Sequence, residues 1–197
     1  MLLQEKLKNY RIILASGSPR RRQLLADCGM EFTVAEKYEV EETHPDSMAA
    51  KDVPVYLSEL KSNAYPSELS GNEILITADT VVILDDRILG KPKGREDAVA
   101  ILGALSGRKH TVITGVTLRD STRMYNFASS TDVFFKTLSA EEIAYYVDTF
   151  KPYDKAGAYG IQEWIGYIGI ERIEGSFYNV MGLPVQRLCA ELGSFIK

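Results

Sequence analysis

The most constraining feature of this sequence is an apolar run that ends in a turn of small residues and continues as a helix. Residues 12–15 have the length and branching of a buried strand, and the small residues 16–18 interrupt the apolar pattern. Ser18 is a natural N-cap, and Pro19 suits a first helical turn because its missing N–H would be unpaired there. The sequence therefore predicts a strand, a tight turn and a helix over about residues 19–28.

The predicted helix begins with three consecutive arginines, Arg20, Arg21 and Arg22. Cations near a helix N-terminus oppose the helix dipole by roughly 0.3–1 kcal/mol each, whereas anions are stabilised there. The alternative interpretation is a solvated basic first turn after an ordinary strand–helix corner. The combination of arginines, hydroxyls and a glycine favours the binding of a highly negative ligand.

The whole-chain composition limits the other classes of function. The chain has 197 residues and a net charge of −4, which argues against a general nucleic-acid binder held by bulk positive charge. No apolar run approaches the ~20 residues of a membrane span, and no secretory signal is recognisable. The two cysteines, Cys28 and Cys189, lie in apolar, helix-like contexts. We interpret them as buried thiols in a reducing compartment and expect a cytoplasmic location.

Strand-like and helix-like segments alternate along the chain, which predicts an α/β or α+β fold with a mixed, twisted sheet and flanking helices. Because no linker is recognisable, we expect a single domain over residues 1–197. Helices are expected over residues 54–65, 95–105, 139–147 and 184–192, the last one ended by Gly193. Strands are expected over residues 32–35, 74–84 with an interruption at 77–80, 87–89, 111–118, 124–135 and 164–173.

Asp79 stands inside the most apolar segment of the chain, between residues 74–76 and 81–83. Strand interiors are poor in Asp, and an unpaired buried carboxylate costs several kcal/mol. Asp79 therefore needs a cation, either a basic side chain or a metal. A structural ion pair or a turn position is the alternative to a functional role.

Further chemistry-bearing groups stand where loops meet regular elements. Lys91 lies between a glycine and a proline, whereas Lys61 on a mixed helix is by itself typical of a surface residue. Residues 156–162 are built of small residues, which allow close approach to a ligand, together with Tyr159 for stacking and the amide of Gln162. His44 and His110 have no metal-ligand spacing, and no P-loop motif is present.

These groups together predict a nucleoside triphosphate site. A triphosphate carries about −4 charge, which the four cations Arg20, Arg21, Lys61 and Lys91 can offset. Each attraction at 4 Å is about 1 kcal/mol in water and about 4 kcal/mol near a protein surface. Acidic groups beside these cations then make sense as Mg²⁺ ligands.

The ordered set of motifs resembles the Maf family of nucleotide pyrophosphatases over essentially the whole chain. The matching segments are Ser-Gly-Ser-Pro-Arg-Arg at 16–21, Ala-Asp-Thr-Val-Val at 78–82, Leu-Gly-Lys-Pro at 89–92, Ser-Gly at 106–107, Thr-Gly-Val at 114–116, Asp-Lys-Ala-Gly-Ala-Tyr-Gly-Ile-Gln at 154–162 and Asn-Val-Met-Gly-Leu-Pro at 179–184. The resemblance implies a fold like that of inosine-triphosphate pyrophosphatases, with the site in a cleft between two lobes. It also implies cleavage between the α and β phosphates, a divalent metal (Mg²⁺ or Mn²⁺) and a homodimer, without a membrane or a stable nucleic-acid partner.

The resemblance also implies roles for individual residues. Asp79 matches the family's proton acceptor, and Glu42, with Glu41 in second place, matches an acidic position that helps Asp79 hold the metal. The phosphate-binding set corresponds to Ser16, Arg20, Arg21, Lys61 and Lys91. The positions associated with choice of base correspond to Arg20, Thr80 and Gln162.

The Ala-Gly-Ala-Tyr-Gly-Ile-Gln form resembles the branch of the family that acts on dTTP and UTP. A glutamine amide complements the carbonyl and N–H edge of uracil or thymine. The chain departs from the family pattern at Phe150-Lys151 and at Glu163-Trp164, the latter next to Gln162. Two alternatives stay open: a regulator of cell division that binds nucleotide or nucleic acid without turnover, and a pyrophosphatase that prefers modified purine triphosphates such as 7-methyl-GTP.

Overall fold

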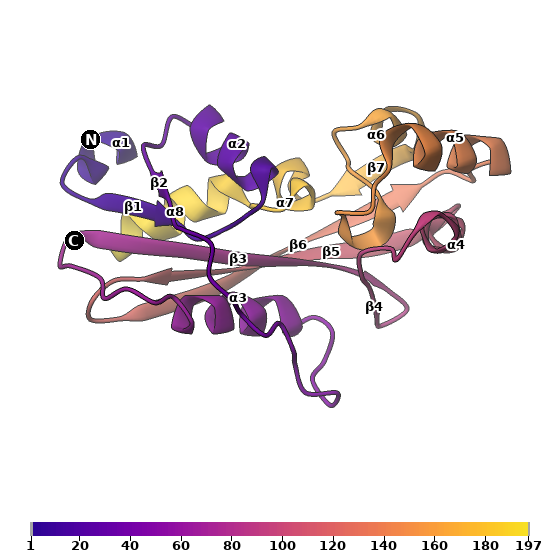
Figure 1. Ribbon diagram of the computed structural model, residues 1–197. Coiled ribbons are helices and arrows are strands. Elements are labelled where there is room, and N and C mark those ends of the chain that lie inside the picture. The colour runs from indigo at the N-terminus through magenta and orange to yellow at the C-terminus, as the bar shows by residue number, and fades with distance from the viewer. Residues whose placement is uncertain (1, 197) are drawn as a thin grey trace. The chain divides into compact units, whose positions relative to one another are not determined.

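The computed structural model describes residues 2–196, in which helices and strands alternate along the chain (Figure 1). The helices are α1 (Leu3–Leu7), α2 (Pro19–Asp27), α3 (Val53–Asn63), α4 (Arg95–Leu105), α5 (Ala140–Phe150), the 3-10 turn η1 (Ala156–Ala158), α6 (Trp164–Gly169), α7 (Phe177–Met181) and α8 (Val185–Phe195). The strands are β1 (Arg11–Leu14), β2 (Thr33–Val34), β3 (Glu73–Leu84), β4 (Arg87–Leu89), β5 (Lys109–Arg119), β6 (Met124–Phe135) and β7 (Ile170–Glu174).

The strands form a mixed sheet in the order β2-β1-β3-β5-β6-β7, with β4 paired to β3. Strand β1 runs parallel to β2 and β3, whereas β4 and β7 run antiparallel to β3 and β6. The predicted α/β class, with a mixed sheet and flanking helices, is confirmed. Between residues 2 and 196, no helix has both the length and the apolar character to cross a membrane.

The chain divides into two compact units. The first unit holds the described residues up to Asp79, Thr114–Ser129 and the described residues from Gly182 on. The second unit holds Thr80–Ile113 and Ser130–Met181. The cleft that the family resemblance implies, and the single domain expected from the sequence, stay predictions.

In the first unit, the predicted strand–turn–helix is confirmed. Strand β1 is buried from Ile12 on and pairs with β3, with Leu14 opposite Ile76. Ser18 caps α2, because its Oγ accepts the N–H of Arg21 at 3.4 Å, and Pro19 is the first helical residue. Local rules of strand burial and helix capping are sufficient to specify this part of the fold.

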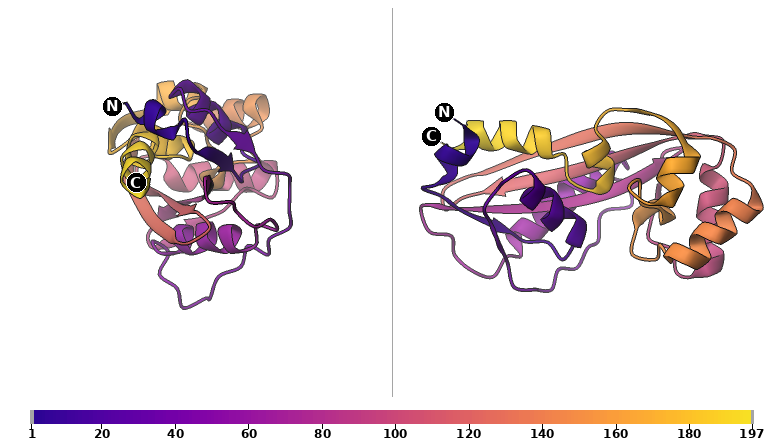
Figure 2. Two further views of the ribbon diagram at one scale, coloured as in Figure 1. Left: turned by 90° about the vertical axis from the view of Figure 1, so that its left-hand side faces the viewer. Right: turned by 90° about the horizontal axis from the view of Figure 1, so that it is seen from above.

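Helix α3 covers one face of the first unit's strands, and α1, α2 and α8 lie on the other face (Figure 1). Gly115 of β5 permits close packing of α3, since a Cβ there would stand 2.3 Å from the carbonyl carbon of Pro54. The Ser58 hydroxyl in α3 is 2.8 Å from Thr117 Oγ1, and its backbone carbonyl accepts the Thr77 hydroxyl at 2.6 Å. Helix α3 is therefore fixed to both β3 and β5. On the opposite face, α1 packs against α8 (Figure 2).

Strand β3 continues through residues 77–80, where the sequence predicts an interruption. The prediction was wrong because the polar side chains of this stretch find partners on α3. Thr77 donates to the Ser58 carbonyl, and Asp79 accepts from Lys61. The strand thereby tolerates polar groups in an apolar run without breaking its ladder.

The second unit is built around a buried apolar cluster. Helices α4 and α5 pack on each other, and η1 packs on α4. The largest fully buried cluster members are the side chains of Leu102, Leu105, Tyr146 and Ile165.

Two predictions about the C-terminal third of the chain were wrong, and one helix was missed. Residues 164–173 were expected to be a strand, but α6 occupies Trp164–Gly169 and only Ile170–Glu174 is extended. The helix fits because Gly166 lies where a Cβ would stand 1.7 Å from the Ile161 carbonyl oxygen. Helix α8 does not end before Gly193 but continues to Phe195, and α7 has no predicted counterpart.

The interpretation of both cysteines as buried thiols is also wrong. Cys28 ends α2 and Cys189 lies within α8, and both side chains are half-buried. The apolar, helix-like context therefore placed Cys189 correctly on a helix and Cys28 correctly at the end of one, but neither side chain lies in the core.

Candidate functional site

Three charged side chains from distant segments meet in the first unit. The ammonium of Lys61, in the last turn of α3, lies 2.6 Å from Asp79 Oδ1 and 2.9 Å from Glu42 Oε2. The side chains of Lys61 and Asp79 are only 15% and 13% exposed, whereas that of Glu42 is 53% exposed. One cation therefore holds two carboxylates at the edge of the core.

This cluster supplies the cation that the burial of Asp79 requires. The interpretation of Lys61 as an ordinary surface residue is wrong, because its side chain reaches inward to a strand carboxylate. The chemical capacity of the cluster goes beyond a simple pair, since a carboxylate and a cation in contact can share the tasks of accepting a proton and binding a phosphate oxygen.

Arg21 joins three segments of the first unit. Its Nη1 donates to the Ala78 carbonyl at 2.9 Å and to Ser16 Oγ at 3.3 Å, and its Nε donates to the Gly182 carbonyl at 2.8 Å. Arg21 thus ties α2 to the residue before Asp79 and to the turn before α8. This arrangement gives Arg21 a part in positioning Asp79, in addition to its charge.

The electrostatic surroundings of Arg21 link it to the same cluster. Burial lowers the pKa of the Arg21 guanidinium, and the neighbouring Arg20 lowers it further, while the carboxylates of Asp79 and Glu42 act in the opposite direction. The predicted residues Ser16, Arg20, Arg21, Glu42, Lys61 and Asp79 therefore belong to one electrostatic neighbourhood. Glu41 is exposed, and no contact joins its side chain to this group in the described residues.

The loop that carries Glu42 is anchored by Tyr38, which sequence reasoning missed. The Tyr38 hydroxyl donates to the Lys61 carbonyl at 2.8 Å, and its ring packs edge-on against Tyr65 at 5.8 Å. Burial raises the pKa of Tyr38 to about 12, so the phenol keeps its proton as a donor. No local motif signals this contact, because it depends on how the loop folds back onto α3.

In the second unit, three of the motifs are packed together. Val82 of β3 pairs in register with Leu89 of β4. Gly157 donates its N–H to the Gly90 carbonyl at 3.1 Å, and a Cβ on Gly157 would stand 2.9 Å from the Val82 side chain. Gly157 also has a φ of 69°, which favours glycine. The loop that carries Gln162 is thereby fixed to the turn that carries the exposed Lys91.

Gln162 has a buried carbonyl oxygen that finds no hydrogen-bond partner among the described residues. A buried acceptor without a donor costs about 1–3 kcal/mol, which a ligand donor can recover. The neighbouring Glu163 is held by Lys155 at 3.0 Å and by the Tyr146 hydroxyl, which in turn accepts the Gly160 N–H at 3.0 Å. Lys155 and Tyr146 thus brace the segment around Gln162, and only Lys155 lies in a recognised motif.

Trp164, at one of the two places where the chain departs from the family pattern, packs against helix α5. Its ring contacts Tyr145 edge-on at 4.9 Å and lies against the apolar cluster of the second unit. The structure thus accounts for the bulky side chain by packing within the second unit.

Other motifs serve the scaffold. Ser106 accepts the Leu138 N–H at 2.7 Å, and Gly107 adopts a φ of 68°. The buried amide of Asn179 donates to the Val112 carbonyl at 3.1 Å and to Thr131 at 3.0 Å. Ser106 and Gly107 thus fix the turn after α4, and Asn179 holds α7 to β5 and β6.

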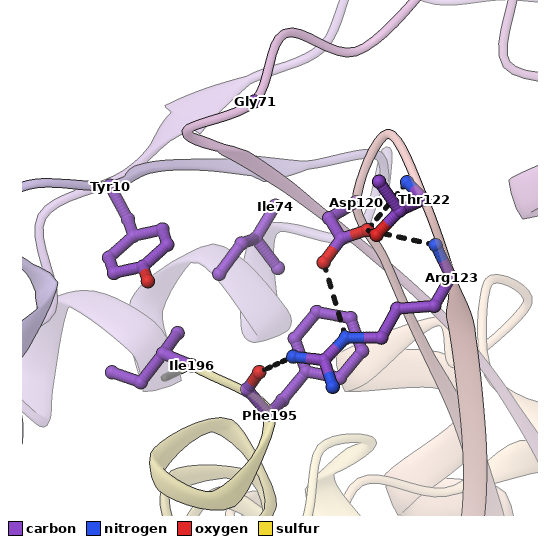
Figure 3. Close-up of a pocket in the computed structure, with 8 residues that line it drawn as sticks. All are labelled: Tyr10, Gly71, Ile74, Asp120, Thr122, Arg123, Phe195 and Ile196. Carbon is purple, nitrogen blue, oxygen red and sulfur yellow. Dashed lines mark hydrogen bonds and ion pairs between the residues drawn. The ribbon is translucent and has the colours of Figure 1, made fainter.

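A cavity of about 210 Å³ lies in the first unit, at the end of strand β3 that is far from Asp79 (Figure 3). Ile74 lines it, five residues before Asp79, which is about 16 Å along a strand. Asp120 and Arg123 close one side through an ion pair, and Arg123 stacks on Phe195 at 4.4 Å. None of the predicted site residues lines this cavity.

Comparisons with known proteins agree with these motifs. A family model described as "Maf-like protein" matches residues 11–195. A protein of Bacteroides thetaiotaomicron named dTTP/UTP pyrophosphatase is 52% identical over 186 residues, covering 94% of this chain and 96% of that protein. One of Parabacteroides distasonis with the same name is 51% identical over 191 residues, covering 97% and 99%.

The fold is also found in a solved structure. The Staphylococcus aureus Ham1 protein aligns with a TM-score of 0.53 and 16% identity, covering 94% of this chain and 99% of that chain. This similarity concerns the architecture alone, whereas the family match covers the motifs from which the site is built. The chain belongs to the Maf family.

Proposed function

We propose that this chain is a nucleoside triphosphate pyrophosphatase that hydrolyses dTTP and UTP to the monophosphate and pyrophosphate. The observation that carries the proposal is the strand carboxylate of Asp79 in contact with Lys61, beside the arginine-rich start of α2. The two relatives named dTTP/UTP pyrophosphatase, each more than 50% identical over nearly the whole chain, support the same substrate class.

In the proposed reaction, Asp79 accepts a proton from the attacking water. The water oxygen forms a bond to phosphorus as the bond between the α and β phosphates breaks, and pyrophosphate leaves. Lys61 exchanges a carboxylate partner for a phosphate oxygen, and Ser16, Arg20, Arg21 and Lys91 complete the phosphate-binding set. Such preorganised cations stabilise the charge that develops on the transferred group.

We further propose that Asp79 and Glu42 hold a divalent cation, Mg²⁺ or Mn²⁺. Among residues 2–196, no three His, Cys, Asp or Glu side chains are grouped to hold a metal. The donor chemistry nevertheless fits, since Mg²⁺ is often bound by one or two carboxylates together with substrate phosphates, and these two carboxylates already share one cation, the Lys61 ammonium. The ion supplies positive charge at the phosphate oxygens when bound.

Choice of base is proposed to rest on Arg20, Thr80 and Gln162. Uracil and thymine present an N–H between two carbonyls, which an amide can match with one acceptor and one donor. The unpartnered, buried carbonyl oxygen of Gln162 supports this assignment, because the base N–H would satisfy it.

We also propose the domain organisation, the location and the assembly of the chain. The chain acts as one Maf-like domain over residues 1–197, works in the cytoplasm and forms a homodimer. Light scattering after size-exclusion chromatography measures the mass of the assembly. A mass of one chain at micromolar concentration would contradict the dimer.

The test of the proposed function is a product assay over canonical and modified triphosphates with Mg²⁺ or Mn²⁺. We expect pyrophosphate and monophosphate from dTTP and UTP at higher kcat/KM than from any purine triphosphate. Faster turnover of 7-methyl-GTP would overturn the substrate assignment. Tight, salt-dependent nucleic-acid binding without turnover of any nucleotide would overturn the enzyme assignment in favour of a regulator.

A further inference from the structure

A backbone hydrogen bond and a folded-back side chain close the turn that carries Gln162. In this turn, residues 160–163, the Glu163 N–H donates to the Gly160 carbonyl at 3.0 Å. The Glu163 side chain lies over the same turn, since a Cβ on Gly160 would stand 2.9 Å from the Glu163 carboxyl carbon. Gln162 therefore stands between two residues that contact each other through both backbone and side chain.

The Tyr146 hydroxyl, from helix α5, bridges the two ends of this turn. It accepts the Gly160 N–H at 3.0 Å and donates to the Glu163 carboxylate. Burial and the hydrogen bond to Glu163 raise the pKa of the Tyr146 phenol, which therefore keeps the proton that it donates. The Tyr146 ring is fully buried and stacks on Phe150 at 5.2 Å. The bridge is thus anchored in a packed helix.

An ion pair holds the other oxygen of the Glu163 carboxylate. Lys155 Nζ lies 3.0 Å from Glu163 Oε1, and the two side chains are only 10% and 20% exposed. The same ammonium lies 2.8 Å from the more exposed carboxylate of Asp154. Charges with so little exposure need partners, and here Tyr146 and Lys155 occupy both oxygens of Glu163.

The Gln162 amide depends on this turn for its direction. Its carbonyl oxygen is buried and has no hydrogen-bond partner between residues 2 and 196. The position of the amide is therefore set by the backbone of the turn, whose two ends Tyr146 and Glu163 hold. A displacement of about 1 Å is enough to spoil the fit of such a group to a bound substrate.

We propose that Tyr146 and Glu163 are positioning residues that determine the choice of base by holding the turn of Gln162. This inference rests on the proposed pyrophosphatase function and adds two residues outside the proposed base-contacting set. Neither residue contacts the base itself. Both act through Gln162, and Lys155 keeps the Glu163 carboxylate in place.

The test is the base selectivity of Tyr146→Phe, which keeps the buried ring and removes only the bridging hydroxyl. We expect the preference for UTP over CTP in kcat/KM to fall by about three- to fivefold, because the amide is aimed less well. KM for UTP should rise by a larger factor than kcat falls, since no proposed phosphate contact belongs to the bridge. The matched control is Tyr167→Phe, which removes the hydroxyl of a residue that is 83% exposed.

A double variant separates positioning from a general effect on the fold. If Tyr146 acts through Gln162, Tyr146→Phe should lower the UTP preference no further in a Gln162→Ala background. The same fold-change in both backgrounds would overturn the proposal, whatever the stability of the variants. Unchanged selectivity in a folded Tyr146→Phe would overturn it as well.

Two substitutions of Glu163 provide a second measure. Glu163→Ala removes both contacts of the carboxylate, so we expect the same loss of UTP preference as in Tyr146→Phe. Glu163→Gln keeps an acceptor for the Tyr146 hydroxyl and should retain about half of the wild-type preference. Wild-type preference in Glu163→Ala, or no recovery in Glu163→Gln, would overturn the role of Glu163.

The wild-type protein in the same assay distinguishes this inference from the function on which it rests. Pyrophosphate release from UTP by wild type, together with unchanged selectivity in the variants, would leave the proposed function standing and overturn only the positioning role. Absence of pyrophosphate release by wild type would overturn both.

Discussion

In the first unit, Asp79 and Glu42 are both satisfied by Lys61, whereas in the second unit Gln162 has a buried oxygen that no described residue satisfies. The charged cluster is held by its own ion pairs, and the Gln162 segment is held by backbone packing around Gly157. A ligand must displace existing partners in the first case and supplies a missing partner in the second. The two regions should therefore respond to different kinds of mutation.

Among the variants that contrast the two regions, the largest loss of activity is expected for a substitution of Lys61. Lys61→Met leaves two carboxylates without their shared cation, one of them only 13% exposed. We expect kcat/KM to fall by about 10²- to 10³-fold, as for the loss of a transition-state donor, and stability to fall by about 2 kcal/mol. Steady-state kinetics and urea unfolding measure both effects.

The exposed Lys51 provides a matched control, since Lys51→Met removes the same charge without an ion pair in the described residues. Turnover of Lys61→Met at the wild-type rate would show that Lys61 takes no part in the reaction and that its ion pairs with Asp79 and Glu42 are only structural.

A second contrast concerns the loss of stability at low pH, because the second unit buries a histidine that is uncharged in the folded protein. His110 is 2.7 Å from the Tyr159 hydroxyl, and burial lowers the pKa of His110 to about 4, against about 6.5 in an unfolded chain. Between these values the unfolded chain binds more protons, so wild-type stability falls as the pH drops through this window, by at most about 1.4 kcal/mol per pH unit.

His110→Gln, which cannot titrate, should lose less stability than wild type between pH 7 and about pH 4.5, by about 2–3 kcal/mol. Urea unfolding at the two pH values measures the difference, and the exposed His44→Gln serves as the control. Parallel losses in wild type and His110→Gln would show that His110 is not held neutral by the fold.

Backbone packing around Gln162 is tested at Gly157. Gly157→Ala places a methyl 2.9 Å from Val82 at a φ of 69°, and we expect a loss of about 2 kcal/mol together with weaker selection among bases. In α4, Gly103 has open space around it, so Gly103→Ala should be neutral or stabilise by up to about 1 kcal/mol. Equal stability of the two variants would show that Gly157 does not constrain its loop.

The smallest effect is expected at Gln162 itself. Gln162→Ala removes one amide–base pairing worth about 1 kcal/mol, so the preference for UTP over CTP in kcat/KM should drop by about five- to tenfold. Turnover of UTP at saturation should change less than in Lys61→Met. An unchanged UTP preference would place base selection elsewhere in the chain.

The parts of the fold that follow from local chemistry were predictable from the sequence. Ser18 and Pro19 specify the start of α2, and the Ser139–Glu142 capping box specifies the start of α5. In contrast, α6 could not be distinguished from a strand, because its apolar run lacks a helix signal and its packing depends on the contact of Gly166 with Ile161. Gly193 does not end α8, since a helical glycine costs only about 1 kcal/mol and the surrounding packing of Leu192 and Phe195 outweighs it.

The candidate site shows the same division. Burial of Asp79 predicted a cation nearby, but neither Lys61 nor Glu42 could be chosen as its partner from spacing alone. The contact arises because Gly115 lets α3 pack closely on β5 and Tyr38 anchors the acidic loop to α3. The contacts of Lys61 with Asp79 and Glu42 therefore depend on tertiary packing between segments that are far apart in the sequence, which local sequence patterns do not predict.

The central claim is that Asp79 takes the proton of the attacking water, and Asp79→Asn tests it most directly. The amide keeps the shape and a hydrogen bond to Lys61 but cannot accept a proton, and Asp46→Asn on the exposed loop is the matched control. We expect turnover of UTP to fall by about 10²- to 10⁴-fold, while UTP affinity from calorimetry stays within a few-fold of wild type. Turnover at the wild-type rate in Asp79→Asn would contradict the claim.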